Sequence, residues 1–293
     1  MKIDRLIKRY PVLSFLVVTF SWSWIIWSGL YRAIPGGMYA APGVPNQLPG
    51  SFIWFFILGG MGPSLMGIVM TRIIQGKGSI RKYLSQVFQW RIKLRWFLTV
   101  LLTAPILAFI ARQLQETMGW EVAPILPMSG IVPALLMGLC AGLLEEFGWR
   151  GFALSKLLPR YTPLTAGLIV GIPWGLWHWI AAYWGVGAVY GSYFVTFFLV
   201  ADISNLTAYS ILMAYVCTAV KERVLPAVLF HASMAASINI FLADVASPIE
   251  TIKLLGMFSV LSWLAVGLIL YSLRDIGIKR DLSSSTGKNE IRS

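Results

Sequence analysis

The chain has 293 residues, of which 57% are hydrophobic and only 12% charged, and its mean hydropathy is +0.73. This composition lies far outside the range of soluble globular proteins and indicates a polytopic membrane protein. The 24 Lys and Arg residues outnumber the 12 Asp and Glu residues. No segment is long enough to form a solvated basic domain, so we expect no nucleic-acid partner.

Apolar runs of about 20 residues, the length that a helix needs to cross the membrane hydrocarbon, follow one another along the chain. They lack the short alternating segments of a membrane barrel, so we predict an all-α fold with about eight transmembrane helices. The first run follows Tyr10 without a clear signal-peptide cleavage site and should remain as an anchor. The predicted spans lie near residues 11–30, 51–70, 97–114, 130–154, 163–184, 190–220, 224–243 and 254–272.

The distribution of charge indicates the orientation of these spans. Residues 190–220 could form one long helix or two short ones. If they form one, every Lys and Arg except Arg32, Arg112 and Lys253 falls on the side of the N terminus. The positive-inside rule favours that arrangement. We therefore predict a multi-pass protein of the cell membrane with both termini in the cytoplasm.

The domain organisation is simple. Residues 1–280 should form a single transmembrane domain, and the polar segment 281–293 should be a disordered tail. The basic stretch 72–95 is either an interfacial helix on lipid headgroups or a solvated loop. Membrane lipid is accordingly one expected partner, and the oligomeric state is left open.

One apolar run, AGLLEEFGWRGF, carries Glu145, Glu146 and Arg150. An ionisable side chain at bilayer depth costs about 2.5 to 3.5 kcal/mol on insertion scales, so these groups call for an explanation. Only Glu146 is four residues from Arg150, and successive helical residues are about 100° apart. Glu146 and Arg150 should pair, which leaves Glu145 free to face a cavity and take a proton from water. The alternative is that all three residues only form polar contacts that hold neighbouring helices together.

Both histidines of the chain also lie in apolar runs. His178 follows Pro173, which should kink its helix and open a cavity. Together with His231 and Glu145 it could bind a divalent metal such as zinc, or orient a water without a metal. Asp202 either supports this site from behind or marks a helix break, and we favour the break.

These motifs, in this order, resemble those of a known family. EExxxR is followed by Gly151 and Phe152, then Trp174 precedes His178 by four residues, and a later helix carries His231. The pattern, over about residues 136–239, resembles the CAAX-protease and bacteriocin-processing (CPBP, Abi) family of intramembrane proteases. The predicted catalytic residues are Glu145, Glu146, Arg150, His178 and His231, and the predicted auxiliary residues are Trp174, Asp202 and Asn239.

The resemblance implies an eight-helix fold around a conical cavity open to the cytoplasm. It also implies that Glu145 activates the hydrolytic water with help from His178, while His231 stabilises the oxyanion. If a metal is bound, the same three residues would hold it. The family usually has Asn four residues after the last His, but here that residue is Ala235. Asn239 is one turn further on and is not an obvious substitute.

The predicted function is hydrolysis of a peptide bond in a membrane-associated or lipid-anchored protein or peptide, by a glutamate-activated water. Losing one oxyanion donor typically costs about 10² to 10³ in rate, so Ala235 permits a weakened enzyme. Two alternatives stay open. The first is a catalytically impaired scaffold that binds a membrane partner, and the second is a proton-coupled transporter that uses the intramembrane acids.

Overall fold

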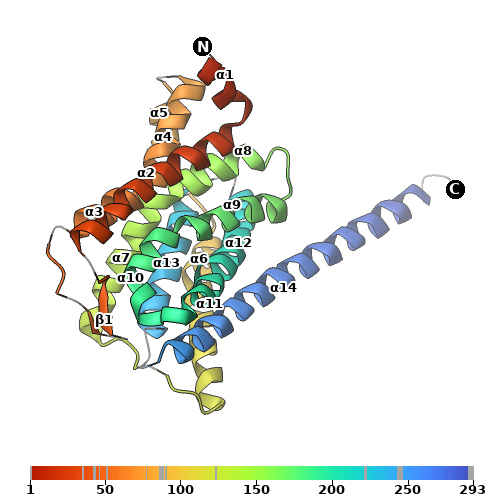
Figure 1. The fold of residues 1–293 in the computed structure, drawn as a ribbon. Helices are drawn as coiled ribbons and strands as arrows, with labels where there is room; N and C mark the ends of the chain where they lie inside the picture. The colour runs from red at the N-terminus through yellow and green to blue at the C-terminus, as the bar shows by residue number, and fades with distance from the viewer. Residues whose placement is uncertain are drawn as a thin grey trace.

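The computed structural model describes residues 2–34, 36–41, 44–45, 47–50, 52–76, 78–85, 89, 91–122, 124–220, 223–242 and 247–289. Most of these residues are helical, which confirms the predicted all-α class (Figure 1). The described residues also include a short antiparallel pair of strands, β1 (Tyr39–Ala41) and β2 (Val44–Pro45), in the loop after the first long helix.

The N-terminal half is built from long helices joined by short ones. A bend of 41° separates the third and fourth helices, where the second of the two begins with Pro63 in its first turn. Proline suits the first turn of a helix because its missing N–H has no intrahelical partner there. The helices are α1 (Lys2–Arg9), α2 (Pro11–Ala33), α3 (Phe52–Gly60), α4 (Gly62–Gln75), α5 (Ser79–Leu84) and α6 (Leu94–Thr117).

The C-terminal half contains two π-helical interruptions, η2 and η4. A break at His178 also separates α9 from α10. The predicted kink at Pro173 is not the point of interruption, because the helix continues through that proline and ends at Trp177, just before His178. The elements are α7 (Met128–Glu146), η2 (Phe147–Leu154), α8 (Ser155–Leu157), α9 (Pro163–Trp177), α10 (Trp179–Tyr190), η3 (Gly191–Tyr193), α11 (Phe194–Phe198), η4 (Leu199–Ser204), α12 (Asn205–Ala219), α13 (Leu225–Phe241) and α14 (Pro248–Asn289).

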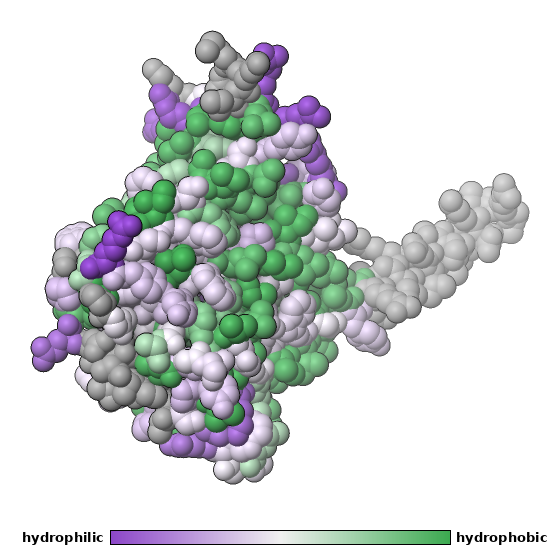
Figure 2. Space-filling view, in the orientation of Figure 1, coloured by the Kyte–Doolittle hydropathy of each residue, from purple (hydrophilic) through white to green (hydrophobic). Residues whose placement is uncertain are grey.

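Among the described residues, five helices are long and apolar enough to cross a membrane, or six if the bent pair α3–α4 is one span. Two further predicted spans correspond to α9 and α13, which are apolar but shorter. The count of eight therefore stays a prediction. Figure 2 shows a hydrophobic surface across the middle of the molecule, with hydrophilic residues near α1 and α5.

Two further predictions concern the basic stretch 72–95 and the C-terminal segment 281–293. Within the basic stretch 72–95, α5 packs against the bundle, where the Tyr83 hydroxyl donates a hydrogen bond to the Phe147 carbonyl. Residues 77, 86–88 and 90 of that stretch lie outside the described part of the chain. α14 continues to Asn289 and so enters the segment 281–293 predicted to be a disordered tail. That segment contains no proline that would end a helix.

Glycines spaced four apart allow the central helices to approach closely. A Cβ added at Gly171 of α9 would lie 2.8 Å from the Cα of Thr207 on α12, and one added at Gly167 would lie 2.7 Å from the Cα of Ile211. On α7, a Cβ at Gly142 would lie 2.6 Å from a backbone oxygen of α13. Small residues at such spacing are the usual contact points between membrane helices. They bring together the four helices that carry the polar groups described below.

We predict that Gly171→Ala lowers the stability of the folded protein by about 1 to 3 kcal/mol, because overpacking forces backbone atoms apart. The measurement is thermal unfolding of the purified protein in detergent. Gly267→Ala, on α14, is the matched control, since a Cβ there meets nothing within 4 Å. An equal loss of stability in both variants would contradict the close-packing account.

Candidate active site

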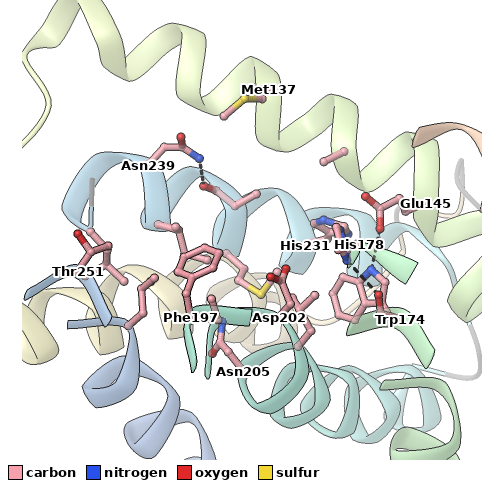
Figure 3. Close-up of a pocket in the computed structure, with 18 of the residues that line it drawn as sticks. Met137, Glu145, Trp174, His178, Phe197, Asp202, Asn205, His231, Asn239 and Thr251 are labelled. Carbon is pink, nitrogen blue, oxygen red and sulfur yellow. Dashed lines mark hydrogen bonds between the residues drawn. The ribbon is translucent and has the colours of Figure 1, made fainter. Parts of the chain in front are cut away.

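A cavity of about 660 Å³ lies between α7, α9, η4, α12 and α13, and it collects the polar groups singled out in the sequence. Its walls include Glu145 from α7, Trp174 and His178 from α9 and its C-terminal end, and His231 from α13 (Figure 3). These residues lie up to 86 positions apart along the chain. Helix packing therefore assembles a single polar cavity within an apolar bundle.

Glu146 is the buried acceptor that ties two helices together. Its Oε1 atom accepts a hydrogen bond from the Arg150 guanidinium at 2.7 Å, as the four-residue spacing predicted, and lies 2.8 Å from Nδ1 of His231. All three residues are buried, with exposed fractions of 0%, 4% and 4% in that order. Because His231 lies on α13, this carboxylate links the C-terminal end of α7 to the facing helix.

Glu145 points away from that ion pair, because adjacent residues of a helix are about 100° apart around its axis. Its Oε2 atom accepts a hydrogen bond from the indole N–H of Trp174 at 2.7 Å. No other hydrogen bond to this carboxylate is found among the described residues. Glu145 lines the cavity. One carboxylate oxygen is thus anchored, and the other is left for a ligand.

Trp174 contacts Glu145, Arg150 and both histidines, and it is completely buried. The Arg150 guanidinium carbon lies 4.1 Å from the centroid of its ring, within the range of a cation–π contact. Its ring lies 5.2 Å from the ring of His231 in an edge-on arrangement. Its backbone carbonyl lies 2.9 Å from Nδ1 of His178. The residue that the sequence marked as auxiliary therefore orients Glu145 and both histidines.

The hydrogen bonds fix which nitrogen each imidazole presents to the cavity. A carbonyl oxygen can only accept, so Nδ1 of His178 carries a proton and donates to Trp174. Nδ1 of His231 donates in the same way to the Glu146 carboxylate. In both rings Nε2 remains for a ligand, and both side chains line the cavity.

The remaining predicted residues lie further along the cavity wall. Asp202 falls in η4, so the helix is irregular at this residue, and its side chain also lines the cavity. Ala235 faces the same space. The Asn239 amide donates to the carbonyl of Ala235 at 2.8 Å, one turn back on its own helix. Asn239 is therefore committed to α13 and does not replace the asparagine that the family usually has at position 235.

The zinc alternative requires three ligands converging on one point. Among the described residues no group of three or more His, Cys, Asp or Glu side chains is arranged to hold a metal ion. The three ligands suggested by the sequence, Glu145, His178 and His231, each make a hydrogen bond within the protein. The same bonds leave Nε2 of each imidazole and one oxygen of Glu145 for a ligand, as in a metal site, so zinc binding stays a prediction, and the chemistry below is derived from the side chains alone.

The cavity extends along two of the helices that carry the site. Its walls continue from His231 along α13 to Leu242, and from Glu145 back along α7 to Leu126. The opening towards the cytoplasm that the resemblance implied stays a prediction.

Two comparisons with known proteins agree with the motifs. Residues 127–237 match the family model described as type II CAAX prenyl endopeptidase Rce1-like. A CAAX prenyl protease 2 of Methanococcus maripaludis is 24% identical over 238 residues, which cover 76% of this chain and 82% of the relative. Both findings confirm the family resemblance predicted from the sequence. The region matched by the family model includes Glu145, His178 and His231.

We predict that Glu146→Ala lowers stability by about 3 to 5 kcal/mol, because it leaves the buried Arg150 without its counter-charge. The double variant with Arg150→Ala should be less destabilised than the sum of the two single changes. The measurement is a double-mutant cycle of thermal stability in detergent. Glu116→Ala is the control, because its pair with Arg112 is partly exposed and should contribute about 0 to 1 kcal/mol. Additive losses at 146 and 150 would disprove the coupling.

Proposed function

We propose that this chain, in keeping with its resemblance to the CAAX-protease family, is an intramembrane endopeptidase in which Glu145 activates a water molecule. The observation that carries the proposal is the pairing of a singly anchored carboxylate with two imidazoles in one cavity. The named relative is called a CAAX prenyl protease. For this chain we propose that the substrate is a membrane-associated or lipid-modified protein or peptide. We also propose that the enzyme lies in the cell membrane with both of its termini in the cytoplasm.

The proposed reaction begins when Glu145 takes a proton from water, and the resulting hydroxide attacks the carbonyl carbon of the scissile amide. The tetrahedral intermediate carries negative charge on the former carbonyl oxygen. His231, whose Nδ1 is bonded to the Glu146 carboxylate, would donate to that oxygen from Nε2 with a proton taken up from solvent, and the Glu146 carboxylate compensates the positive charge. His178 helps to position the water through its free Nε2 atom. Glu145 then returns the proton to the leaving amine as the C–N bond breaks.

The geometry around Ala235 supports an enzyme with a reduced rate. Ala235 lines the cavity but offers no donor to an oxyanion. Asn239 bonds to its own helix. His231 would therefore stabilise the oxyanion without the second donor that the family pattern provides. The same observation favours the rival function, a scaffold that binds a membrane partner in this cavity without cleaving it.

We predict that Glu145→Gln and His178→Ala reduce peptide cleavage by about 10² to 10⁴ while the protein stays folded. The assay is mass spectrometry of products from a farnesylated C-terminal peptide and from its unmodified counterpart, incubated with the purified protein in detergent. Glu121→Gln, in an exposed loop, is the matched control and should retain full activity. Cleavage at the wild-type rate by Glu145→Gln would refute the assigned role.

Ala235→Asn separates a weakened enzyme from a scaffold. We expect cleavage to rise by about 10-fold or more, since an oxyanion donor is worth about 10² to 10³ in rate and the new side chain will be imperfectly placed. The measurement is the initial rate under the same conditions. If neither wild type nor Ala235→Asn cleaves any peptide in the panel, the scaffold function is favoured instead.

A further inference from the structure

The cavity beside Glu145 carries a second carboxylate in its wall, that of Asp202. This side chain makes no hydrogen bond or ion pair with any residue in the described part of the chain. The described residues that line the cavity include no Lys or Arg. Arg150, which is close to the site, is already paired with Glu146. Asp202 is therefore an acidic group of the wall that no described cation neutralises.

Asp202 lies close to the polar groups of the site because η4 packs tightly on α9. A Cβ added at Gly175 of α9 would lie 2.6 Å from the backbone oxygen of Asp202. Gly175 directly follows Trp174 and precedes His178 by three residues. Figure 3 shows Asp202 in the wall of the cavity that also holds both histidines. A ligand that contacts the histidines is thus within reach of this carboxylate.

Asn205 adds a hydrogen-bond donor to the same part of the wall. It follows Asp202 by three residues, so the two side chains lie on one face of the helix, and both line the cavity. Its Oδ1 atom accepts a hydrogen bond from the Ser262 hydroxyl. Its Nδ2 atom is buried and has no partner among the described residues, and the whole residue is only 1% exposed. A buried donor without an acceptor is costly, and a ligand that accepts from Nδ2 removes that cost.

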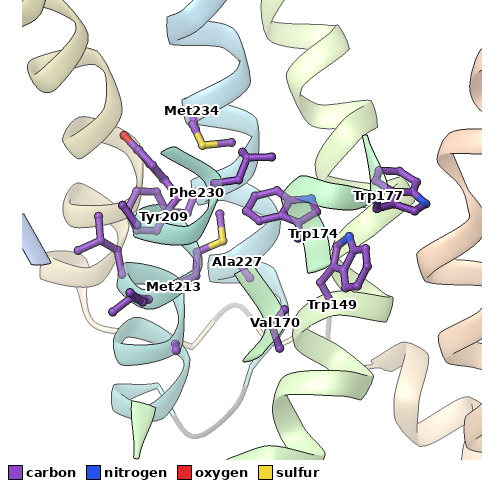
Figure 4. Close-up of a cluster of buried hydrophobic side chains, with 14 of the residues drawn as sticks. Trp149, Val170, Trp174, Trp177, Tyr209, Met213, Ala227, Phe230 and Met234 are labelled. Atoms are coloured by element: carbon purple, nitrogen blue, oxygen red, sulfur yellow. The ribbon is translucent and has the colours of Figure 1, made fainter. Parts of the chain in front are cut away.

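The room for a ligand lies on the side of Asp202. Next to the site, a packed core contains Trp149, Val170, Met213, Ala227 and Phe230, each at most 1% exposed (Figure 4). None of these five residues lines the cavity. The cavity wall itself is mostly apolar around Asp202 and Asn205, with Met137, Phe197, Leu206 and Ile238 among its residues. A ligand that reaches Glu145 therefore extends past an apolar wall with one carboxylate and one amide in it.

We propose that Asp202 and Asn205 form a subsite for a basic residue of the substrate. The Asp202 carboxylate pairs with the ammonium of Lys or the guanidinium of Arg, because a carboxylate away from water is best compensated by an opposite charge. Asn205 donates from Nδ2 to a main-chain carbonyl of the same segment. The substrate class is then an apolar or lipid-modified polypeptide with one basic residue near the scissile bond. That the ligand is a substrate rests on the proposed function, whereas its binding does not.

A binding measurement with matched peptides tests the subsite. The protein is the Glu145→Gln variant in a non-ionic detergent, so that cleavage does not interfere. The probes are fluorescently labelled, farnesylated C-terminal peptides in which one Lys is placed at each position in turn. Each has a counterpart with norleucine and one with Glu at the same position, and Kd is measured by fluorescence anisotropy. Asp202→Asn is added to remove the charge, and Glu121→Gln, in an exposed loop, is the matched control.

We expect the Lys peptide to bind about 10-fold or more tightly than its norleucine counterpart at one position at least, and the Glu peptide to bind most weakly there. Asp202→Asn should abolish this preference and leave the norleucine peptide bound as before, while Glu121→Gln keeps the preference. Asn205→Ala should weaken binding of the Lys and norleucine peptides by the same factor. The proposal is overturned if Lys gives no advantage at any position, or if the advantage survives in Asp202→Asn.

Cleavage of the same peptides by the protein with Glu145 intact tests the proposed function separately. A Lys preference in binding without cleavage of any peptide would support the subsite and count against the peptidase. Cleavage that is equally fast for the Lys and norleucine peptides at every position would support the peptidase and overturn the subsite.

Discussion

The buried carboxylate of Glu146, shared between Arg150 and His231, is the interaction on which the rest of the site depends. Moving an ion pair out of water costs several kcal/mol per ion, so it is retained only where the partners meet in good geometry. Both bonds to Oε1 are short, at 2.7 and 2.8 Å. Because the two partners lie on different helices, the pair fixes the rotation of α7 about its axis. That rotation directs Glu145 towards Trp174 and the cavity.

Close helix packing makes this geometry possible. Gly142 brings α7 against α13, where His231 meets Glu146, and Gly171 brings α9 against α12. Trp174, on α9, then spans the gap between the two helix pairs through its bond to Glu145 and its contact with Arg150. The same packing leaves a cavity on one side of these polar groups and a dense apolar core on the other. The polar site and the cavity beside it are thus formed by one arrangement of four helices.

The sequence predicted local features of the site better than long-range ones. The pairing of Glu146 with Arg150 followed from helical spacing, and the all-α class followed from hydropathy. The partner of Glu146 on α13 could not be predicted, since spacing along one helix says nothing about a facing helix. The kink predicted at Pro173 stays a prediction, whereas the end of the helix at Trp177, directly before His178, was not signalled by the sequence.

The central claim is that Trp174 holds Glu145 in position to activate water. The most direct measurement is the rate of peptide cleavage by Trp174→Phe, which keeps an aromatic ring but removes the N–H that bonds to Glu145. Trp177→Phe is the matched control, because that indole is equally buried and its N–H has no acceptor among the described residues. The account predicts that kcat falls by about 10-fold or more for Trp174→Phe, with KM nearly unchanged, while Trp177→Phe stays close to wild type. Equal rates for the two variants would contradict it.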